Sequence, residues 1–256
     1  MSFKQENPHL IPGFHSVRDA LTQGRLRIQE VWISKGKGSG RIREIIRMAQ
    51  VRKIPIRFKE DSELAALFPG TVHQGVAAKI EEFHYSDLNE VIAASMRRPG
   101  HALLVAADHI TDEGNLGALV RTAAFFGAHG LILPKDRSAG ISATVLKRSS
   151  GGYLHLPVVK VVNMGRTLDF LEKKGFWIIG AAGEGRESIY EFDWRRDLVL
   201  ALGNEERGLT RSVRERCHQV VRITGSARVE SLNVSVAGGV ILSEIIRQRR
   251  LASHEL

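Results

Sequence analysis

Three short polar segments of this sequence each follow an apolar run and carry side chains that could do chemistry. They are residues 108–117, residues 203–209 and residues 231–237. The first holds Asn115, with Arg121 six residues later, while the second holds Glu205 and the third Asn233. Amide, guanidinium, carboxylate and hydroxyl groups together can orient a polar substrate and handle a proton. If the apolar runs are parallel strands, their carboxyl ends meet at one edge, where open α/β folds bind ligands.

The elements that must position these segments alternate from His101 onward. Apolar runs predict six strands, and amphipathic helical patterns lie between them. The strands are expected at Leu103–Ala107, Leu131–Leu133, Val158–Val162, Trp177–Gly180, Leu198–Leu202 and Gln219–Ile223. Such alternation is typical of a mainly parallel sheet with helices on both faces, so the expected fold class is α/β.

The N-terminal part has its own alternation between residues 9 and 82. Helices are expected at Ser16–Gln23 and Arg41–Arg52, and strands at Ile28–Ile33, Ile54–Phe58 and Gly75–Ile80. We therefore expect a small α/β domain over residues 1–82, a linker over 83–99 and a larger domain over 100–256. Within the linker, Ser86 could cap a short helix through Ala94. The glycine-rich basic loop 36–41 is either a solvated loop or a contact to RNA phosphate.

Composition narrows the class of partner. Of 256 residues, 43% are hydrophobic, which is enough for a buried core, and 37 Lys and Arg against 28 Asp and Glu give a net charge of +9. This charge suits a polyanion such as RNA, although charge alone fits a merely basic protein equally well. Cys217 is the single cysteine, which indicates a reducing cytoplasm. We expect no signal peptide, no membrane span and no metal site, because neither apolar runs of that length nor Cys and His clusters occur.

The polar segments resemble the three motifs of the SpoU (TrmH-like) family of RNA 2′-O-ribose methyltransferases, in the SPOUT superfamily. The matching residues are Asn115 with Arg121, Gly203-Asn204-Glu205, and Ser231-Leu232-Asn233-Val234-Ser235-Val236-Ala237, in family order and at family-like spacing. The resemblance implies a C-terminal parallel-sheet domain with a deep trefoil knot and a small N-terminal domain like ribosomal protein L30 that binds substrate RNA. It also implies S-adenosylmethionine as methyl donor and a homodimer. Lys135-Asp136-Arg137-Ser138 favours the members that methylate a guanosine ribose of 23S rRNA.

The same resemblance assigns catalytic roles, and each assigned residue also has an ordinary interpretation. Arg121 would be the principal catalytic residue, with Asn115 holding the site geometry; otherwise they are a surface arginine and a helix N-cap. Glu205, in preference to its neighbour Glu206, would orient nearby groups. Ser231 and Asn233 would belong to the active site, and either could instead cap the following helix.

The cofactor side of the site is expected at strand ends. By resemblance, Gly203, Ile223 and Leu232 contact the adenosyl group, although Ile223 and Leu232 could simply be core. Gly203 would leave room for a flat ligand, because glycine permits close backbone approach. Ala182 and Gly183, in the loop after Trp177–Gly180, are expected to line the same side.

The implied reaction is methyl transfer to a ribose 2′-hydroxyl, which needs alignment and a route for one proton. An arginine pKa above about 12 makes a poor general base, so an electrostatic role for Arg121 is favoured and the general-base role stays open. Two rival functions remain: a tRNA ribose 2′-O-methyltransferase, and a non-enzymatic rRNA-binding protein. The separate N-terminal module favours rRNA over tRNA, and the full set of catalytic residue types disfavours a pure binder.

Overall fold

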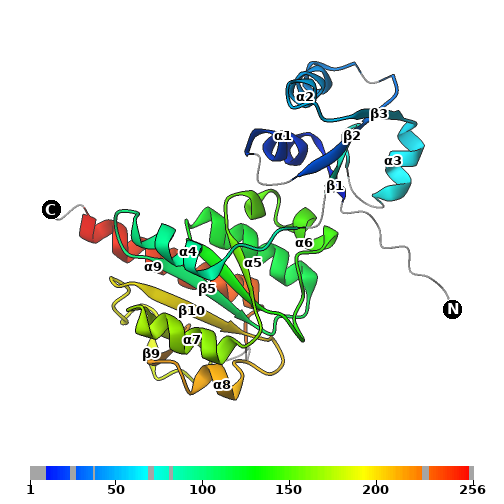
Figure 1. The fold of residues 1–256 in the computed structure, drawn as a ribbon. Helices are drawn as coiled ribbons and strands as arrows, with labels where there is room; N and C mark the ends of the chain where they lie inside the picture. Colours follow the sequence, from blue (N-terminus) through cyan, green and yellow to red (C-terminus); the bar gives the residue numbers. More distant parts are fainter. Residues whose placement is uncertain are drawn as a thin grey trace. The chain divides into compact units, whose positions relative to one another are not determined.

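The computed structural model describes residues 10–23, 27–36, 38–68, 72–80, 83–226 and 231–253. The chain divides into two compact units. The first comprises the described residues up to His84 together with Ile141–Leu154, and the second comprises Tyr85–Gly140 and the described residues from His155 onward. Figure 1 shows the fold of both units, with labels on many of their helices and strands.

The first unit is built on a four-stranded sheet in the order β1-β4-β2-β3. Its strands are β1 (Leu10–Pro12), β2 (Ile28–Ser34), β3 (Ile56–Lys59) and β4 (Val76–Ile80), and its helices are α1 (Phe14–Gln23), α2 (Gly40–Val51), α3 (Asp61–Leu67) and α6 (Ala143–Arg148) with the 3₁₀ turn η1 (Gly152–Leu154). β2 and β3 pair in parallel, and β4 pairs antiparallel with both β1 and β2. The predicted helices and strands of residues 9–82 are present here within two residues at each end, whereas β1 and α3 were not predicted.

Local sequence explains why α2 begins and which side it buries. Ser39 caps the helix by accepting a hydrogen bond from the Ile42 N–H at 3.4 Å. Ile42, Ile45 and Ala49 recur at helical spacing and are buried, so the apolar stripe read from the sequence faces the interior of the unit. The basic loop 36–41 is described except for Lys37, which lies outside the described residues.

The second unit contains a seven-stranded sheet in the order β7-β6-β5-β10-β8-β11-β9. Its strands are β5 (Leu103–Asp108), β6 (Gly130–Pro134), β7 (Val158–Val161), β8 (Trp177–Ala181), β9 (Glu187–Ser188), β10 (Leu198–Gly203) and β11 (Gln219–Arg222). Every pairing in this sheet is parallel. The α/β class and the six predicted parallel strands are therefore confirmed, with the two-residue β9 as an addition.

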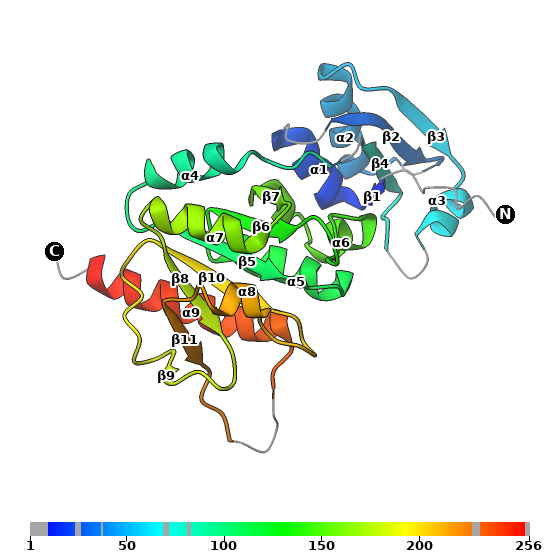
Figure 2. The ribbon, with the colours of Figure 1, turned by 60° about the horizontal axis from the view of Figure 1, so that its bottom comes forward.

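Helices cover both faces of this sheet (Figure 2). They are α4 (Leu88–Met96), α5 (Glu113–Phe125), α7 (Met164–Lys173), α8 (Arg211–Arg214) and α9 (Val234–Ser253). α4, α7 and α8 share one apolar cluster with alternate residues of the central strands, such as Leu104 and Ala201. α5 and α9 contact each other extensively, and the Gly238 backbone approaches Leu119 and Leu202 from the other face.

Two segments belong to a different unit than a division in sequence order predicts. The expected linker contains α4, capped by the Asp87 carboxylate rather than Ser86, and its Val91 and Ile92 are part of the second unit's core. The connection from β6 to β7 carries α6 and η1, which belong to the first unit. The crossover between two neighbouring strands of one unit therefore supplies structure to the other.

Candidate functional site

The candidate site forms where β5 and β10 end side by side. Asp108, the last residue of β5, is in register with Gly203, the last residue of β10. The two polar segments that follow these strands therefore leave the sheet at the same edge, as the apolar runs predicted. β8 pairs in parallel with β10, β11 pairs in parallel with β8, and both end at the same edge.

Asp108 anchors the loop that follows β10. Its carboxylate is fully buried, accepts a hydrogen bond from the Thr210 N–H at 2.6 Å and lies 2.7 Å from Nδ1 of His109. His109 has a left-handed backbone, with φ of 57°, and its carbonyl accepts a hydrogen bond from Asn204 Nδ2 at 3.0 Å. Because an unpaired buried carboxylate is costly, these partners hold both segments in one arrangement.

Asn204 closes the loop into a tight turn. Its Oδ1 accepts hydrogen bonds from the N–H groups of Glu206 at 2.9 Å and Arg207 at 3.3 Å. Its backbone exchanges two hydrogen bonds with Gly208, which has a φ of 65° that favours glycine. Glu205 is thereby placed at the exposed tip of the turn.

Glu205 meets two asparagines that come from the other polar segments. Its Oε1 accepts a hydrogen bond from Asn115 Nδ2 and another from Asn233 Nδ2, the latter at 3.3 Å. Asn233 Nδ2 also donates to Asn115 Oδ1 at 2.8 Å. Residues separated by up to 118 positions thus form one polar cluster, which we call the Asn-Glu-Asn cluster. The carboxylate in it is that of Glu205, the one that the family resemblance favoured over Glu206.

The helix starts show how the two asparagines reach this cluster. The expectation that Asn115 begins its helix is wrong: α5 starts at Glu113, and Asp112 is the cap, accepting the Asn115 N–H at 2.7 Å. The Asn115 amide is therefore left to face Glu205. Asn233 does cap α9, because its Oδ1 accepts the Ser235 N–H at 2.9 Å while its Nδ2 serves the cluster. Ser231 is exposed, two residues before that cap.

Arg121 lies on α5 beyond the cluster. Six residues separate it from Asn115, a rise of about 9 Å along a helix. The buried side of α5 carries Leu116, Leu119 and Val120, and the Arg121 side chain is exposed outside that stripe. The structure thus brings together Asn115, Glu205 and Asn233 and places Arg121 further along the same helix.

The residues expected on the cofactor side lie at three adjacent strand ends. Ala182 follows β8, Gly203 ends β10 and Ile223 follows β11, and Ala182 donates its N–H to the Val221 carbonyl at 3.0 Å. Gly183, next to Ala182, is exposed. Leu232 precedes Asn233 and keeps 49% of its surface exposed. Small residues and an exposed apolar side chain at the strand ends suit a flat adenosyl group, so this edge fits S-adenosylmethionine.

The structure gives a second reason for a glycine at position 203. A Cβ built there would lie 2.2 Å from the carbonyl carbon of Gly208 and 2.4 Å from the Leu209 nitrogen. The space beside Gly203 is therefore occupied by the returning backbone of its own loop. A residue without a Cβ is therefore needed at position 203 for the turn that presents Glu205. This requirement holds whether or not the Gly203 backbone also contacts a ligand.

Sequence patterns assigned no role to Asp108, His109 or Thr210, whose hydrogen bonds hold the two polar segments together. One signal was present: Asp108 is a carboxylate at the end of a strand that is otherwise wholly apolar. Its partners were not predictable, because Thr210 is 102 residues away. Nearby, burial together with the charge of Asp108 raises the pKa of Cys217 to about 11, which keeps this thiol protonated at neutral pH.

Among the described residues, no helix has the length and apolarity that a bilayer span requires. In the same part of the chain, no three His, Cys, Asp or Glu side chains are grouped to hold a metal ion.

Two family models and several curated relatives match this chain. Residues 102–243 match the model of the SpoU rRNA Methylase family, and residues 10–86 match the model for RNA 2'-O ribose methyltransferase substrate binding. The chain is 38% identical over 237 residues to the 23S rRNA (guanosine-2'-O-)-methyltransferase RlmB of Pseudomonas aeruginosa, covering 93% of this chain and 95% of that protein. For RlmB of Xylella fastidiosa the identity is 40%, with 94% and 97% covered.

Solved structures give the same result in three dimensions. The SpoU methyltransferase AviRb from Streptomyces viridochromogenes superimposes with a TM-score of 0.83 at 26% identity, over 96% of this chain and 91% of that one. A second AviRb structure, in complex with the cofactor AdoMet, has a TM-score of 0.81 at 25% identity, over 94% and 90%. From its sequence matches and its fold, this chain belongs to the SpoU rRNA methylase family.

Proposed function

We propose that this protein transfers a methyl group from S-adenosylmethionine to the 2′-hydroxyl of a guanosine in 23S rRNA. The observation that carries the proposal is the Asn-Glu-Asn cluster at the carboxyl edge of the sheet, beside the strand ends at Ala182 and Ile223. Relatives at 36–40% identity that bear the 23S rRNA guanosine name cover more than nine tenths of this chain, which supports the substrate.

The chemistry asked of the protein is modest. S-adenosylmethionine supplies a methyl group already activated by its sulfonium, so the protein must align the 2′-hydroxyl and manage one proton. We assign this role to Arg121, because its exposed planar guanidinium can hold the adjacent phosphate and stabilise negative charge developing on the 2′-oxygen. Arg121 as a general base remains the alternative within this proposal.

The remaining assigned residues position the ribose. The Glu205 carboxylate fixes the orientation of the Asn115 and Asn233 amides, since both donate to its Oε1. Ser231 stands beside this cluster in sequence and offers a hydroxyl. Gly203, Ile223, Leu232, Ala182 and Gly183 are assigned to the cofactor side, because they lie at or beside the strand ends and Leu232 remains exposed.

A tRNA substrate is the second candidate. The structure of the TrmH/SpoU tRNA modifying enzyme of A. aeolicus matches only 65% of this chain, with a TM-score of 0.54 at 27% identity, although 84% of that chain is covered. About a third of this chain therefore has no counterpart in that enzyme. A family model for substrate binding covers the first unit, which favours rRNA and argues against a protein that only binds RNA without reacting.

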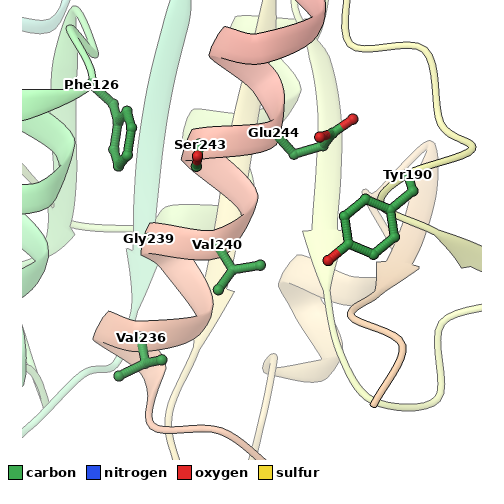
Figure 3. Close-up of a pocket in the computed structure, with 7 residues that line it drawn as sticks. All are labelled: Phe126, Tyr190, Val236, Gly239, Val240, Ser243 and Glu244. Carbon is green, nitrogen blue, oxygen red and sulfur yellow. The ribbon is translucent and has the colours of Figure 1, made fainter.

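We also propose the assembly that the family resemblance implies: a deep trefoil knot in the second unit, an L30-like first unit, a homodimer and a cytoplasmic location. The homodimer is supported by a hollow of about 490 Å³ along α9, which Phe126 and Tyr190 flank on opposite sides of the helix (Figure 3). Val236 and Tyr190 are 51% and 55% exposed there. Apolar surface of this kind is typical of an interface between subunits.

The direct experiment incubates the purified protein with S-adenosylmethionine and unmodified 23S rRNA, and then maps 2′-O-methyl groups by their resistance to alkaline cleavage. We expect one new guanosine 2′-O-methyl group. A bulk tRNA transcript pool is the control substrate. Methylation of tRNA alone would replace the substrate in this proposal, and no methylation of either RNA would refute the enzymatic function.

A further inference from the structure

The first unit has a strongly basic surface that the proposed active site does not use. Residues 41–59 contain seven Lys and Arg and one acidic residue, Glu44, so this stretch carries a net charge of +6 in a chain of +9. Arg43, Arg47, Arg52 and Lys53 are all exposed. None of the four forms an ion pair with another side chain of the described part of the chain.

Helical spacing places two of these arginines on one flank of α2. Arg41 lies on the flank toward α1, where its guanidinium stands 5.5 Å from the Phe14 ring. Arg43 and Arg47 are four residues apart and so share the opposite flank. α1 packs on α2 and on β4, whereas α2 joins β2 to the edge strand β3. The Arg43 and Arg47 flank therefore lies on the β3 side of the helix.

An exposed aromatic ring lies on the same face of the sheet. Phe58 in β3 is in register with Ile33 in β2, so both side chains point to one face. The neighbouring Trp32 packs with Leu64 and Phe68 of the α3 region, which assigns Ile33 and Phe58 to the opposite face. Because α2 joins β2 to β3 and has no residue in that cluster, we infer that it covers this opposite face. At the sheet edge Phe58 keeps 59% of its surface exposed. Arg43, Arg47 and Phe58 thus form one surface, which we call the α2–β3 surface.

We propose that the α2–β3 surface binds an unpaired stretch of the RNA substrate, with a base stacked on Phe58 and the flanking phosphates held by Arg43 and Arg47. This inference rests on the proposed function for the identity of the RNA. An exposed aromatic ring beside arginines that lack an acidic partner is the combination that single-stranded nucleic acid requires, because every base offers a flat face and every linkage a charge. In a duplex those base faces are already stacked, so an exposed ring has no such partner there.

Two cations of the first unit that already have ion-pair partners offer a matched control. Lys35 pairs with Glu60 at 2.6 Å, and Arg57 pairs with Glu30 at 3.0 Å. Arg57 is in register with Trp32 and therefore points to the α3 face. A K35Q/R57Q double variant removes as much charge from the first unit as R43Q/R47Q does, but from side chains already neutralised by partners.

The test measures binding of a labelled oligouridylate of about 12 nucleotides, a length in the range of single-strand sites, and of an RNA duplex of equal length. The full-length protein is used throughout, at several salt concentrations. We expect Phe58→Ala to raise the Kd for the single strand about tenfold without changing its salt dependence, and Phe58→Tyr to bind as wild type. R43Q/R47Q should lower the slope of log K against log salt by about 1.4, near 0.7 for each phosphate that is no longer neutralised. K35Q/R57Q should leave that slope unchanged.

Several results would overturn the proposal. They are wild-type affinity for the single strand in Phe58→Ala, equal slopes in the two double variants, or tighter binding of the duplex than of the single strand by the wild type. Two controls test whether the fold and the cofactor site are intact. The affinity for S-adenosylmethionine, measured by calorimetry, and the thermal unfolding temperature are expected to be unchanged in all variants. Because oligouridylate binding is scored without catalysis, a wild type that fails to methylate 23S rRNA refutes the proposed function and leaves this surface to be judged separately.

Discussion

At the scale of single residues, the site places a carboxylate between two amides rather than beside a cation. Among the described contacts, Glu205 accepts hydrogen bonds from Asn115 and Asn233, which in turn are linked to each other. Hydrogen bonds to a charged acceptor are worth about 1.5–3 kcal/mol each, so this carboxylate fixes which way both amides face. Their remaining donor and acceptor atoms are then available to a ribose in one orientation only.

Replacing this carboxylate tests that role, and its neighbour supplies the control. We expect Glu205→Ala to lower kcat about tenfold to a hundredfold, because both amides lose the acceptor that orients them. Glu206→Ala should stay within about twofold of wild type, since only its backbone N–H, which donates to Asn204, takes part in the turn. Steady-state methylation of 23S rRNA measures both. Equal losses in the two variants would contradict the assignment of Glu205.

Arg121 is the second residue to test, because its place on α5 does not by itself distinguish a catalytic group from a surface arginine. We expect Arg121→Ala to abolish methyl transfer while calorimetry finds S-adenosylmethionine affinity within about twofold of wild type. Arg121→Lys separates two mechanisms. An electrostatic clamp predicts a severe but incomplete loss at every pH, because lysine keeps the charge and loses the planar fork.

A general base predicts a different outcome for Arg121→Lys. Lysine changes its pKa readily when desolvated, so activity would persist with a displaced pH–rate profile. Single-turnover methylation against pH compares wild type with both variants. Wild-type rates in Arg121→Ala would return this residue to the surface role that its helix position first suggested.

The residue types of the site were predictable, and their connections were not. Asn115, Glu205 and Asn233 were identified from motifs, and the structure places them in contact. The support beneath them was missed, since Asp108 and Thr210 are joined only by the fold. The ordinary interpretation of Asn115 was a helix cap, but Asp112 is the cap. A carboxylate and an amide are both good caps, so sequence alone could not choose between them.

At the scale of elements, the backbone of the loop after β10 is the most tightly constrained part of the site. It returns on itself so tightly that the Gly208 backbone fills the space beside Gly203. Buried Asp108 then fastens the far end of the loop through the Thr210 N–H. The strands beneath were readable as apolar runs, whereas a close approach between two backbones leaves no pattern in the sequence except a glycine.

The space around two glycines predicts opposite effects of an alanine substitution on stability. Gly203→Ala should destabilise the protein by about 3 kcal/mol and weaken S-adenosylmethionine binding, because the new Cβ meets backbone that cannot move aside. Gly239→Ala in α9 meets only the Thr122 methyl, at 3.5 Å, and should stabilise by about 0.5–1 kcal/mol through helix propensity. Thermal and urea unfolding of both variants measure these changes. A stable Gly203→Ala protein with normal cofactor affinity would contradict this account of the turn.

At the scale of the whole molecule, the two units cannot be separated by one cut. The chain leaves the second unit between Gly140 and Ile141 and re-enters it between Leu154 and His155. Periodicity predicted two domains in sequence order, because it reports where strands and helices lie and not which core each joins. Val145, Leu146 and Leu154 in this excursion are buried.

Two truncations test this organisation. A protein beginning at His101 loses α4, whose Val91 and Ile92 are nearly fully buried in the second unit's core; at about 1.5–3 kcal/mol for each buried apolar side chain, we expect it to be markedly less stable than one beginning at Tyr85. The protein beginning at Tyr85 still carries residues 141–154 without the rest of their unit. It should therefore aggregate more than a version in which Val145, Leu146 and Leu154 are replaced by serine.

Binding measurements on the serine-substituted truncation separate the roles of the two units. It should bind S-adenosylmethionine with affinity near that of the full chain, because every residue assigned to the cofactor lies in the second unit. Its RNA affinity should be weaker and less dependent on salt, because the basic residues 41–59 are gone. Calorimetry and filter binding at several salt concentrations measure the two quantities. An unchanged salt slope would mean that the second unit alone supplies the RNA surface, and loss of cofactor binding in a well-folded truncation would place part of that site in the first unit.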